Sequence, residues 1–125
     1  MRAGSKTVLV VEDDPDCLDA VADALEASGY GVERAVHGRE ALDVLRSDGH
    51  VDLILLDLMM PVMDGLEFLA RQRSDPTLAS IPVVLLSGEA TLARRAAVLG
   101  VAGHLRKPVD LEALLATLDR LVPRS

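Results

Sequence analysis

Short apolar runs recur at regular intervals along the chain. The first, KTVLVV over residues 6–11, has no polar alternation, which predicts a strand buried on both faces. Similar runs predict four further strands, over 31–36, 53–56, 82–86 and 102–106. The runs at 31–36 and 102–106 are less apolar than the others, so they predict weaker strands.

A segment with helical spacing of apolar residues follows each strand. The first helix is predicted to begin at Pro15, where the Asp14 carboxylate can cap it, and to end at Gly29. The other helices are predicted over 40–46, from Asp64, over 90–99 and after Asp110. Asp64 and Glu67 form an Asp-x-x-Glu pattern that is more typical of a capping box than of a second metal site.

The apolar positions of these helices mark the faces that are expected to be buried. They are Leu18, Val21, Ala22 and Leu25 in the first helix, Ala41, Leu42 and Leu45 in the second, Leu66 and Leu69 in the third, and Leu111, Leu114, Leu115, Leu118 and Leu121 in the last. A polar loop is expected over 74–80.

Five strand–helix units in strict alternation predict one α/β domain, with a parallel sheet that is wound on both faces by helices. A closed (β/α)₈ barrel needs eight such units, so the sheet is expected to be open. The 125 residues are the length of one domain, and residues 1–125 are therefore expected to hold no second, output domain.

Charge and composition exclude several classes of function. The chain has 13 basic and 20 acidic residues, a net charge of −7, which argues against direct binding of nucleic acid. Tyr30 and Phe68 are the only aromatic residues, so no base-stacking surface is expected. The single Cys17, the lack of a signal peptide in MRAGSK and the lack of a long apolar run favour a soluble cytoplasmic protein without membrane contact.

Polar residues that are suited to chemistry stand at the ends of the predicted strands. Glu12 and Asp13 follow the first strand, Asp57 the third, Ser87 the fourth and Lys107 the fifth. The carboxyl ends of parallel strands meet at one edge of a sheet, where ligands bind. Carboxylates that converge there need a cation, and oxygen ligands in an open, hydrated shell favour Mg²⁺ over Ca²⁺. The sequence therefore predicts a magnesium site.

Four motifs resemble one known family, the receiver domain of bacterial two-component response regulators, in the form typical of chemotaxis regulators. They are VLVVEDD at 8–14, LLDLMMPVMDG at 55–65, VVLLSGE at 83–89 and LRKP at 105–108. They occur in family order with similar spacing, and the resemblance covers essentially the whole chain. It implies a five-stranded sheet of order 2-1-3-4-5.

The resemblance implies a role for each residue at the strand ends. Asp57 would accept a phosphoryl group from a phosphohistidine. Lys107 would contact the phosphoryl oxygens, and Ser87 would form a hydrogen bond to them. The Mg²⁺ ligands would be Glu12, Asp13, Asp57 and the backbone carbonyl of Met59.

The resemblance also implies a signalling domain that catalyses its own phosphoryl transfer and autodephosphorylation, rather than a metabolic enzyme. Its partners would be a sensor histidine kinase or a histidine phosphotransfer protein, and a downstream protein target or the next carrier in a relay; a second copy is a further candidate. Ser87 and His104 occupy the family's switch positions. Position 104 is often aromatic in the family, so His104 leaves the mechanism of output open.

Two other functions fit the sequence less well. A phosphatase of the haloacid-dehalogenase type needs a second Asp two residues after the nucleophile, where this chain has Met59. A flavodoxin-like FMN carrier needs a phosphate-binding loop after the first strand, where Glu12, Asp13 and Asp14 would repel a phosphate. Met1 and the end of the last helix near Leu121 favour a complete small regulator, and a fragment of a larger regulator or hybrid kinase is the alternative.

Overall fold

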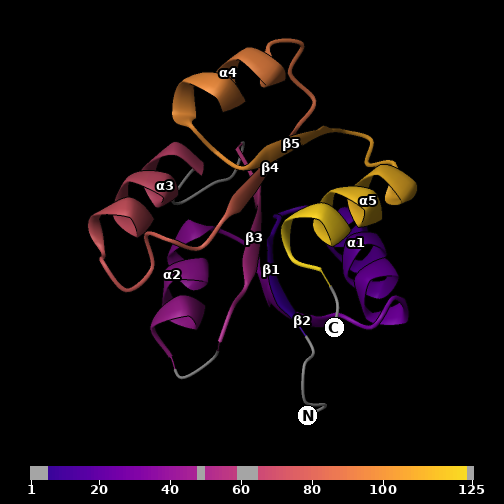
Figure 1. The fold of residues 1–125 in the computed structure, drawn as a ribbon, viewed down its shortest axis with the longest axis horizontal. Coiled ribbons are helices and arrows are strands. Elements are labelled where there is room, and N and C mark those ends of the chain that lie inside the picture. Colours follow the sequence, from indigo (N-terminus) through magenta and orange to yellow (C-terminus); the bar gives the residue numbers. More distant parts are fainter. Residues whose placement is uncertain (1–5, 48–49, 59–64, 124–125) are drawn as a thin grey trace.

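The computed structural model describes residues 6–47, 50–58 and 65–123. Within these ranges the strands and helices alternate as predicted (Figure 1). They are β1 (Thr7–Val11), α1 (Pro15–Ala27), β2 (Gly31–Ala35), α2 (Gly38–Arg46), β3 (Leu53–Asp57), α3 (Gly65–Ser74), β4 (Val83–Ser87), α4 (Leu92–Leu99), β5 (Gly103–Arg106) and α5 (Leu111–Leu121).

The five strands form one parallel sheet of order β2-β1-β3-β4-β5, which confirms the predicted fold. From β1 the chain turns first to β2 and then crosses to β3 on the other side, so the strand order reverses between β1 and β3. In open α/β sheets the carboxyl ends at such a reversal form the ligand crevice. Val11 lies opposite Leu56 in the register, so Glu12 and Asp57 are the next residues along these two strands.

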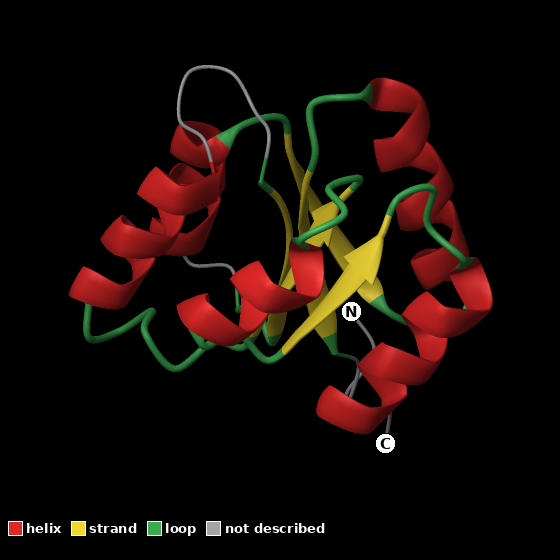
Figure 2. Ribbon diagram, turned by 90° about the horizontal axis from the view of Figure 1, so that it is seen from above, coloured by secondary structure: helices red, strands yellow, loops and turns green. Residues whose placement is uncertain are grey.

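Helices cover both faces of the sheet, α1 and α5 on one side and α2, α3 and α4 on the other (Figures 1 and 2). Each face has its own apolar core. Alternate residues of the central strands enter opposite cores, with Leu9 and Leu56 on the side of α2 and α3, and Val10 and Leu55 on the side of α1 and α5. Because both faces are covered, β1, β3 and β4 are apolar almost throughout, which explains their strong signal in the sequence.

The cap residues fix most helix ends where they were predicted. Asp14 accepts a hydrogen bond from the backbone N–H of Asp16 at the start of α1, and Asp110 caps α5 in the same way. Gly29 ends α1 with a positive φ of 96°, a conformation that favours glycine. None of the described helices is long and apolar enough to cross a membrane.

Two helices begin elsewhere than predicted. α2 begins at Gly38, earlier than the predicted residue 40, because His37 caps it: His37 Nδ1 accepts from the Glu40 N–H at 3.2 Å. The Glu40 carboxylate accepts in turn from the Val36 N–H at 2.9 Å. α4 begins at Leu92, later than the predicted residue 90.

Two leucines that were expected to be buried are exposed. Leu66 and Leu111 are each 41 % exposed. Each lies in the first turn of its helix, and the first buried leucine or phenylalanine of each helix comes later, at Phe68 in α3 and at Leu114 in α5. The predicted cap Asp64 lies outside the described residues.

Gln72 is a buried polar residue that the sequence did not reveal. It is 1 % exposed, and its Nε2 donates hydrogen bonds to the carbonyls of Leu78 at 2.7 Å and Ile81 at 3.3 Å. Both carbonyls belong to the polar segment between α3 and β4. Gln72 therefore holds this segment against the end of α3, since a buried carbonyl needs a donor.

Candidate functional site

Three carboxylates meet at the carboxyl edge of the sheet, beside the reversal of strand order. Glu12 and Asp13 follow β1, and Asp57 is the last residue of β3. One ligand oxygen from each lies within 4.8 Å of the others. Glu12 is fully buried, Asp57 is 3 % exposed, and Asp13 is open to solvent. The structure thus brings together the three acidic side chains that the sequence pointed to.

Lys107 supplies the cation that faces the two buried carboxylates. It follows β5, and its Nζ lies 2.6 Å from Glu12 Oε1 and 3.2 Å from Asp57 Oδ2. The Lys107 side chain is 27 % exposed, so the ammonium is held at the wall of the site rather than in bulk solvent. With one ammonium against three carboxylates, the cluster of Glu12, Asp13, Asp57 and Lys107 has a formal charge of −2.

The pKa values of the paired groups are shifted in opposite directions. Burial by itself raises the pKa of the Glu12 carboxyl, but hydrogen bonds from Lys107 and from the Asp14 backbone outweigh burial and lower this pKa below its usual value. Burial likewise lowers the pKa of Lys107, but Glu12 and Asp57 outweigh burial and raise it. Each partner thus stabilises the charged form of the other.

Cys17 lies beside this cluster, and its thiol interacts electrostatically with Glu12. Burial, followed by the negative charge of Glu12, raises the pKa of its thiol to about 11. The thiol is therefore protonated at neutral pH, and only the thiolate is a nucleophile or a metal ligand. Cys17 packs against the core under α1 and α5, as the sequence suggested.

Ser87 ends β4 and is 1 % exposed. Its Oγ accepts a hydrogen bond from the backbone N–H of Glu89 at 3.0 Å. Its carbonyl accepts from the backbone N–H of Lys107 at 3.0 Å. Ser87 is therefore connected through its side chain to the loop before α4 and through its backbone to the residue that faces Asp57. The Lys107–Pro108 peptide bond is cis.

The backbone at Gly65 packs closely against the backbone of Asp57 and Leu58. The Gly65 N–H donates to the Leu58 carbonyl at 3.1 Å. A Cβ atom at position 65 would lie 2.8 Å from Leu58 Cα and 3.0 Å from the Asp57 carbonyl oxygen, so only glycine fits without displacement of the backbone. Met59, whose carbonyl was predicted to bind Mg²⁺, lies outside the described residues.

The donor set fits a hard divalent cation. All three side-chain ligands offer carboxylate oxygens, which Mg²⁺ prefers. Mg²⁺ also keeps several of its waters, and the exposed Asp13 leaves one side of the cluster open to solvent.

His104 is not part of this acidic cluster. It is exposed on β5, opposite Leu85 of β4, and its neighbour Leu105 points into the core under α1 and α5. Because side chains alternate along a strand, His104 lies on the other face of the sheet, the face that α4 covers.

Two of the grooves that described residues line have similar volumes. One, of about 620 Å³, runs between α1 and the β5–α5 connection and borders Lys107. Its wall is mainly apolar and includes Cys17, Ala20, Val109 and Leu111.

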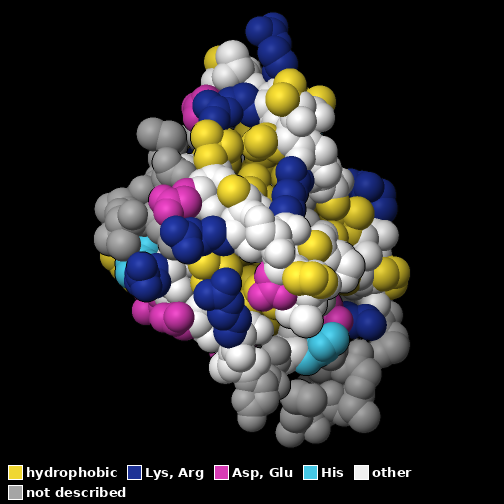
Figure 3. Space-filling view, turned by 90° about the vertical axis from the view of Figure 1, so that its left-hand side faces the viewer, with side chains coloured by type: hydrophobic (Ala, Val, Ile, Leu, Met, Phe, Trp, Pro, Cys, Tyr) yellow, Lys and Arg dark blue, Asp and Glu magenta, His cyan; other side chains and the backbone are white. Residues whose placement is uncertain are grey.

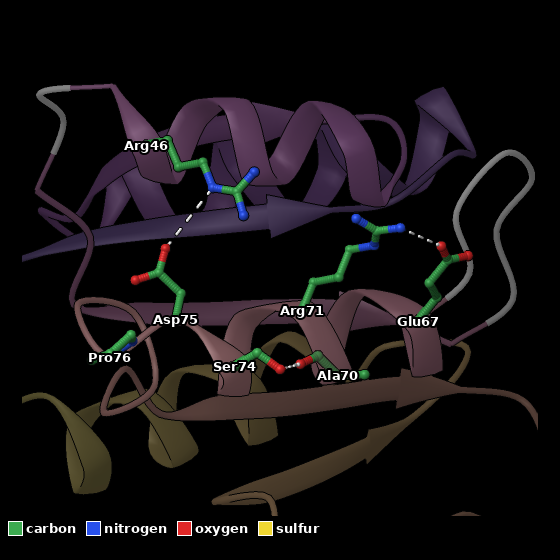
Figure 4. A pocket seen from close by; sticks show the side chains of 7 residues that line it. All are labelled: Arg46, Glu67, Ala70, Arg71, Ser74, Asp75 and Pro76. Carbon is green, nitrogen blue, oxygen red and sulfur yellow. Dashed lines mark hydrogen bonds and ion pairs between the residues drawn. The ribbon is translucent and has the colours of Figure 1, made fainter.

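The other groove, of about 610 Å³, runs between α2 and α3 (Figure 4). Its lining is charged, with one ion pair between Arg46 and Asp75 and another between Arg71 and Glu67. None of the strand-end residues lines it, and basic and acidic side chains are interspersed over this face of the molecule (Figure 3). The first groove is therefore the one connected to the acidic cluster.

Comparisons with known proteins agree with this architecture. Residues 8–119 match the family described as the response regulator receiver domain. The response regulator MprA of Mycolicibacterium vanbaalenii is 40 % identical over 120 residues, which are 94 % of this chain and 51 % of that protein. MprA of Mycobacterium tuberculosis is 38 % identical over 123 residues, which are 97 % of this chain and 52 % of that protein. The chain thus spans about half the length of these curated relatives.

Solved structures show the same fold. The chemotaxis response regulator CheY4 of Vibrio cholerae superposes with a TM-score of 0.85 at 34 % identity, over 94 % of this chain and 99 % of that one. The signal receiver domain of a histidine kinase from Syntrophus aciditrophicus gives a TM-score of 0.83 at 32 % identity, over 94 % of this chain and 90 % of that one.

Proposed function

The chain belongs to the response regulator receiver domain family of two-component systems, and on this premise we propose that Asp57 is the phosphoacceptor of a phosphorylatable switch. The observation that carries the proposal is the nearly buried Asp57 carboxylate, flanked by Glu12 and Asp13 and in contact with Lys107. Residues 1–125 would form the receiver unit. A cytoplasmic location stays a prediction, supported by the single free thiol of Cys17.

In the proposed reaction an Asp57 carboxylate oxygen attacks the phosphorus of a phosphohistidine. The P–O bond forms as the P–N bond breaks, the electron pair stays on the imidazole nitrogen, and that nitrogen takes a proton. Phosphoryl transfer depends mainly on position and on charge neutralisation. Lys107, already 3.2 Å from Asp57, would neutralise the transferred oxygens, and the Ser87 hydroxyl would donate a hydrogen bond to one of them.

Magnesium would be held by Glu12, Asp13, Asp57 and the Met59 carbonyl. When bound, this ion offsets negative charge on the transferring oxygens. Attack of water on the acyl phosphate would return Asp57 to its free form, so the domain would catalyse its own phosphorylation and dephosphorylation and act on no metabolite. The new charge near Ser87 would change the surface that binds a downstream protein, and His104 would occupy the second switch position. Alternatively, the phosphoryl group would pass to the next carrier of a relay.

The proposal is tested by incubating the purified protein with acetyl phosphate and Mg²⁺. We expect the intact mass to increase by one phosphoryl group, and this group to be lost rapidly in base and more slowly in mild acid, because hydroxide readily attacks the mixed anhydride of an acyl phosphate. Chelation of Mg²⁺ with EDTA should reduce the incorporation to background. Incorporation that is stable in base, or that is insensitive to EDTA, would contradict the proposal.

The apolar groove between α1 and the β5–α5 connection is the best candidate for the docking of the phosphodonor protein. It borders Lys107, and the exposed Leu111 lines it. A partner that covers this groove would bring a phosphohistidine to the carboxylate cluster and would bury apolar surface at the same time.

We therefore expect Leu111→Glu to slow phosphorylation by a histidine kinase or phosphotransfer protein roughly 10-fold or more, because burial of an unpaired charge at an interface opposes binding. Phosphorylation by acetyl phosphate should change little. The matched control is Val98→Glu, since Val98 is 81 % exposed on α4 and does not line the groove. Equal slowing by both variants, or by both donors, would refute docking at this groove.

A further inference from the structure

Glu89 contacts both Ser87 and α4. Its backbone N–H donates to Ser87 Oγ at 3.0 Å. Its carboxylate Oε2 lies 3.3 Å from Arg95 Nη1 and 3.5 Å from Thr91 Oγ1. Both charged side chains are only partly exposed, 30 % for Glu89 and 37 % for Arg95, so solvent screens this ion pair less than a fully exposed one.

The position of Arg95 is set by the helix that carries it. α4 begins at Leu92, and the Arg95 N–H donates to the Thr91 carbonyl at 3.0 Å, which places Arg95 in the first turn. From there its guanidinium reaches back to the loop that precedes the helix. The neighbouring Arg94 is exposed and has no ion pair among the described residues, so the two adjacent arginines have different environments.

Charge explains why this ion pair matters for the site. Glu12, Asp13, Asp57 and Lys107 together have a formal charge of −2, which a bound Mg²⁺ would bring only to zero, and the incoming phosphoryl donor is itself an anion. A further carboxylate on the loop that is bonded to Ser87 would add to the repulsion of that donor. The Arg95 guanidinium neutralises the Glu89 carboxylate and holds it toward α4.

We propose that Arg95 is a positioning residue of the phosphoacceptor site: through its ion pair with Glu89 it keeps the Glu89 carboxylate out of the approach of an anionic phosphodonor and holds the loop whose N–H is bonded to Ser87. This inference rests on the proposed function. It assigns to one arginine of α4 a role that its neighbour Arg94 does not share.

The test is a double-mutant cycle on the rate of phosphorylation by acetyl phosphate in the presence of Mg²⁺. We expect Arg95→Gln to slow phosphorylation roughly 3- to 10-fold, because it leaves the Glu89 charge without its partner. In a Glu89→Gln background the same substitution should have almost no effect, since the charge that Arg95 neutralises is gone. Arg94→Gln is the matched control, because it removes the same charge from the same helix and should leave the rate unchanged.

Two readouts separate this role from a purely structural one. The slowing by Arg95→Gln should diminish at high salt, which screens charges at the surface of the site. It should also be smaller with phosphoramidate, which has a lower negative charge than acetyl phosphate at neutral pH. A loss of fold would instead slow both donors equally at every salt concentration.

The inference is overturned if Arg95→Gln is phosphorylated as fast as Arg94→Gln, or if its slowing persists in the Glu89→Gln background. Either result leaves the proposed function intact, provided that the wild-type protein is phosphorylated. If the wild-type protein takes up no phosphoryl group, both the proposed function and this inference are wrong.

Discussion

Asp57→Ala is expected to abolish phosphoryl incorporation from acetyl phosphate, with a loss of at least about 100-fold, because no other group can replace a covalent nucleophile. The neighbouring acids do not offer a substitute. Glu12 is fully buried, and its Oε1 lies 2.6 Å from Lys107 Nζ. Asp13 is exposed, and the ion pairs of Lys107 among the described residues are with Glu12 and Asp57. The measurement is the intact mass after incubation with Mg²⁺ and acetyl phosphate, taken before and after treatment with base, so that only base-labile phosphate is counted.

Asp43→Ala is the control for this experiment. Asp43 is an exposed carboxylate in α2 and is not a member of the acidic cluster, so its removal changes the net charge equally without removing a site residue. The Asp57→Ala protein should stay folded, since Lys107 keeps Glu12 as a partner. If Asp57→Ala gains as much base-labile phosphate as the wild-type protein, the phosphoacceptor is another residue.

The convergence of the three acids could be predicted from sequence because the central strands β1 and β3 change abruptly from apolar to charged residues. The run LILL ends at Asp57, and KTVLVV ends at Glu12; parallel strands then bring those ends to one edge. The particular pairings could not be predicted in this way. Whether Lys107 lies nearer Glu12 or Asp57 depends on side-chain conformation and burial. The Glu89–Arg95 pair likewise depends on where α4 begins.

The fold could likewise be predicted from local sequence patterns, and the errors in helix boundaries and burial have identifiable causes. Asp14 and Asp110 are typical cap residues and marked their helices correctly. His37 is not among the preferred caps, so the start of α2 was placed too late. Leu66 and Leu111 have the spacing of buried residues, but each lies in the first turn of its helix and is exposed. Periodicity indicates the apolar face of a helix but not how much of that face the rest of the protein covers in the first turn.

Lys107→Ala is expected to destabilise the metal-free protein by about 1–3 kcal/mol, because it leaves Glu12 and Asp57 close together in a buried site without a cation. Breaking a fully buried ion pair costs about 3–5 kcal/mol, and the lower range allows for the partial exposure of Lys107. The pKa of Lys107 is raised in the folded protein, so this contribution is fully present at neutral pH. It is lost as the pH rises through the folded-state pKa of Lys107, and also as the pH falls through the lowered folded-state pKa of Glu12.

Thermal unfolding in EDTA and in Mg²⁺ tests this prediction. A loss of this size should lower the Tm in EDTA by roughly 3–12 °C for a domain of this length. Mg²⁺ should stabilise Lys107→Ala more than the wild-type protein, since a divalent cation then supplies all of the positive charge that the three carboxylates need. The matched control is Arg106→Ala, which removes an exposed cation from the neighbouring position and should alter neither Tm. If Mg²⁺ stabilised Lys107→Ala and the wild-type protein equally, the ion would bind away from Glu12 and Asp57. A larger stabilisation of Lys107→Ala would show that the ammonium and the metal ion neutralise the same charges.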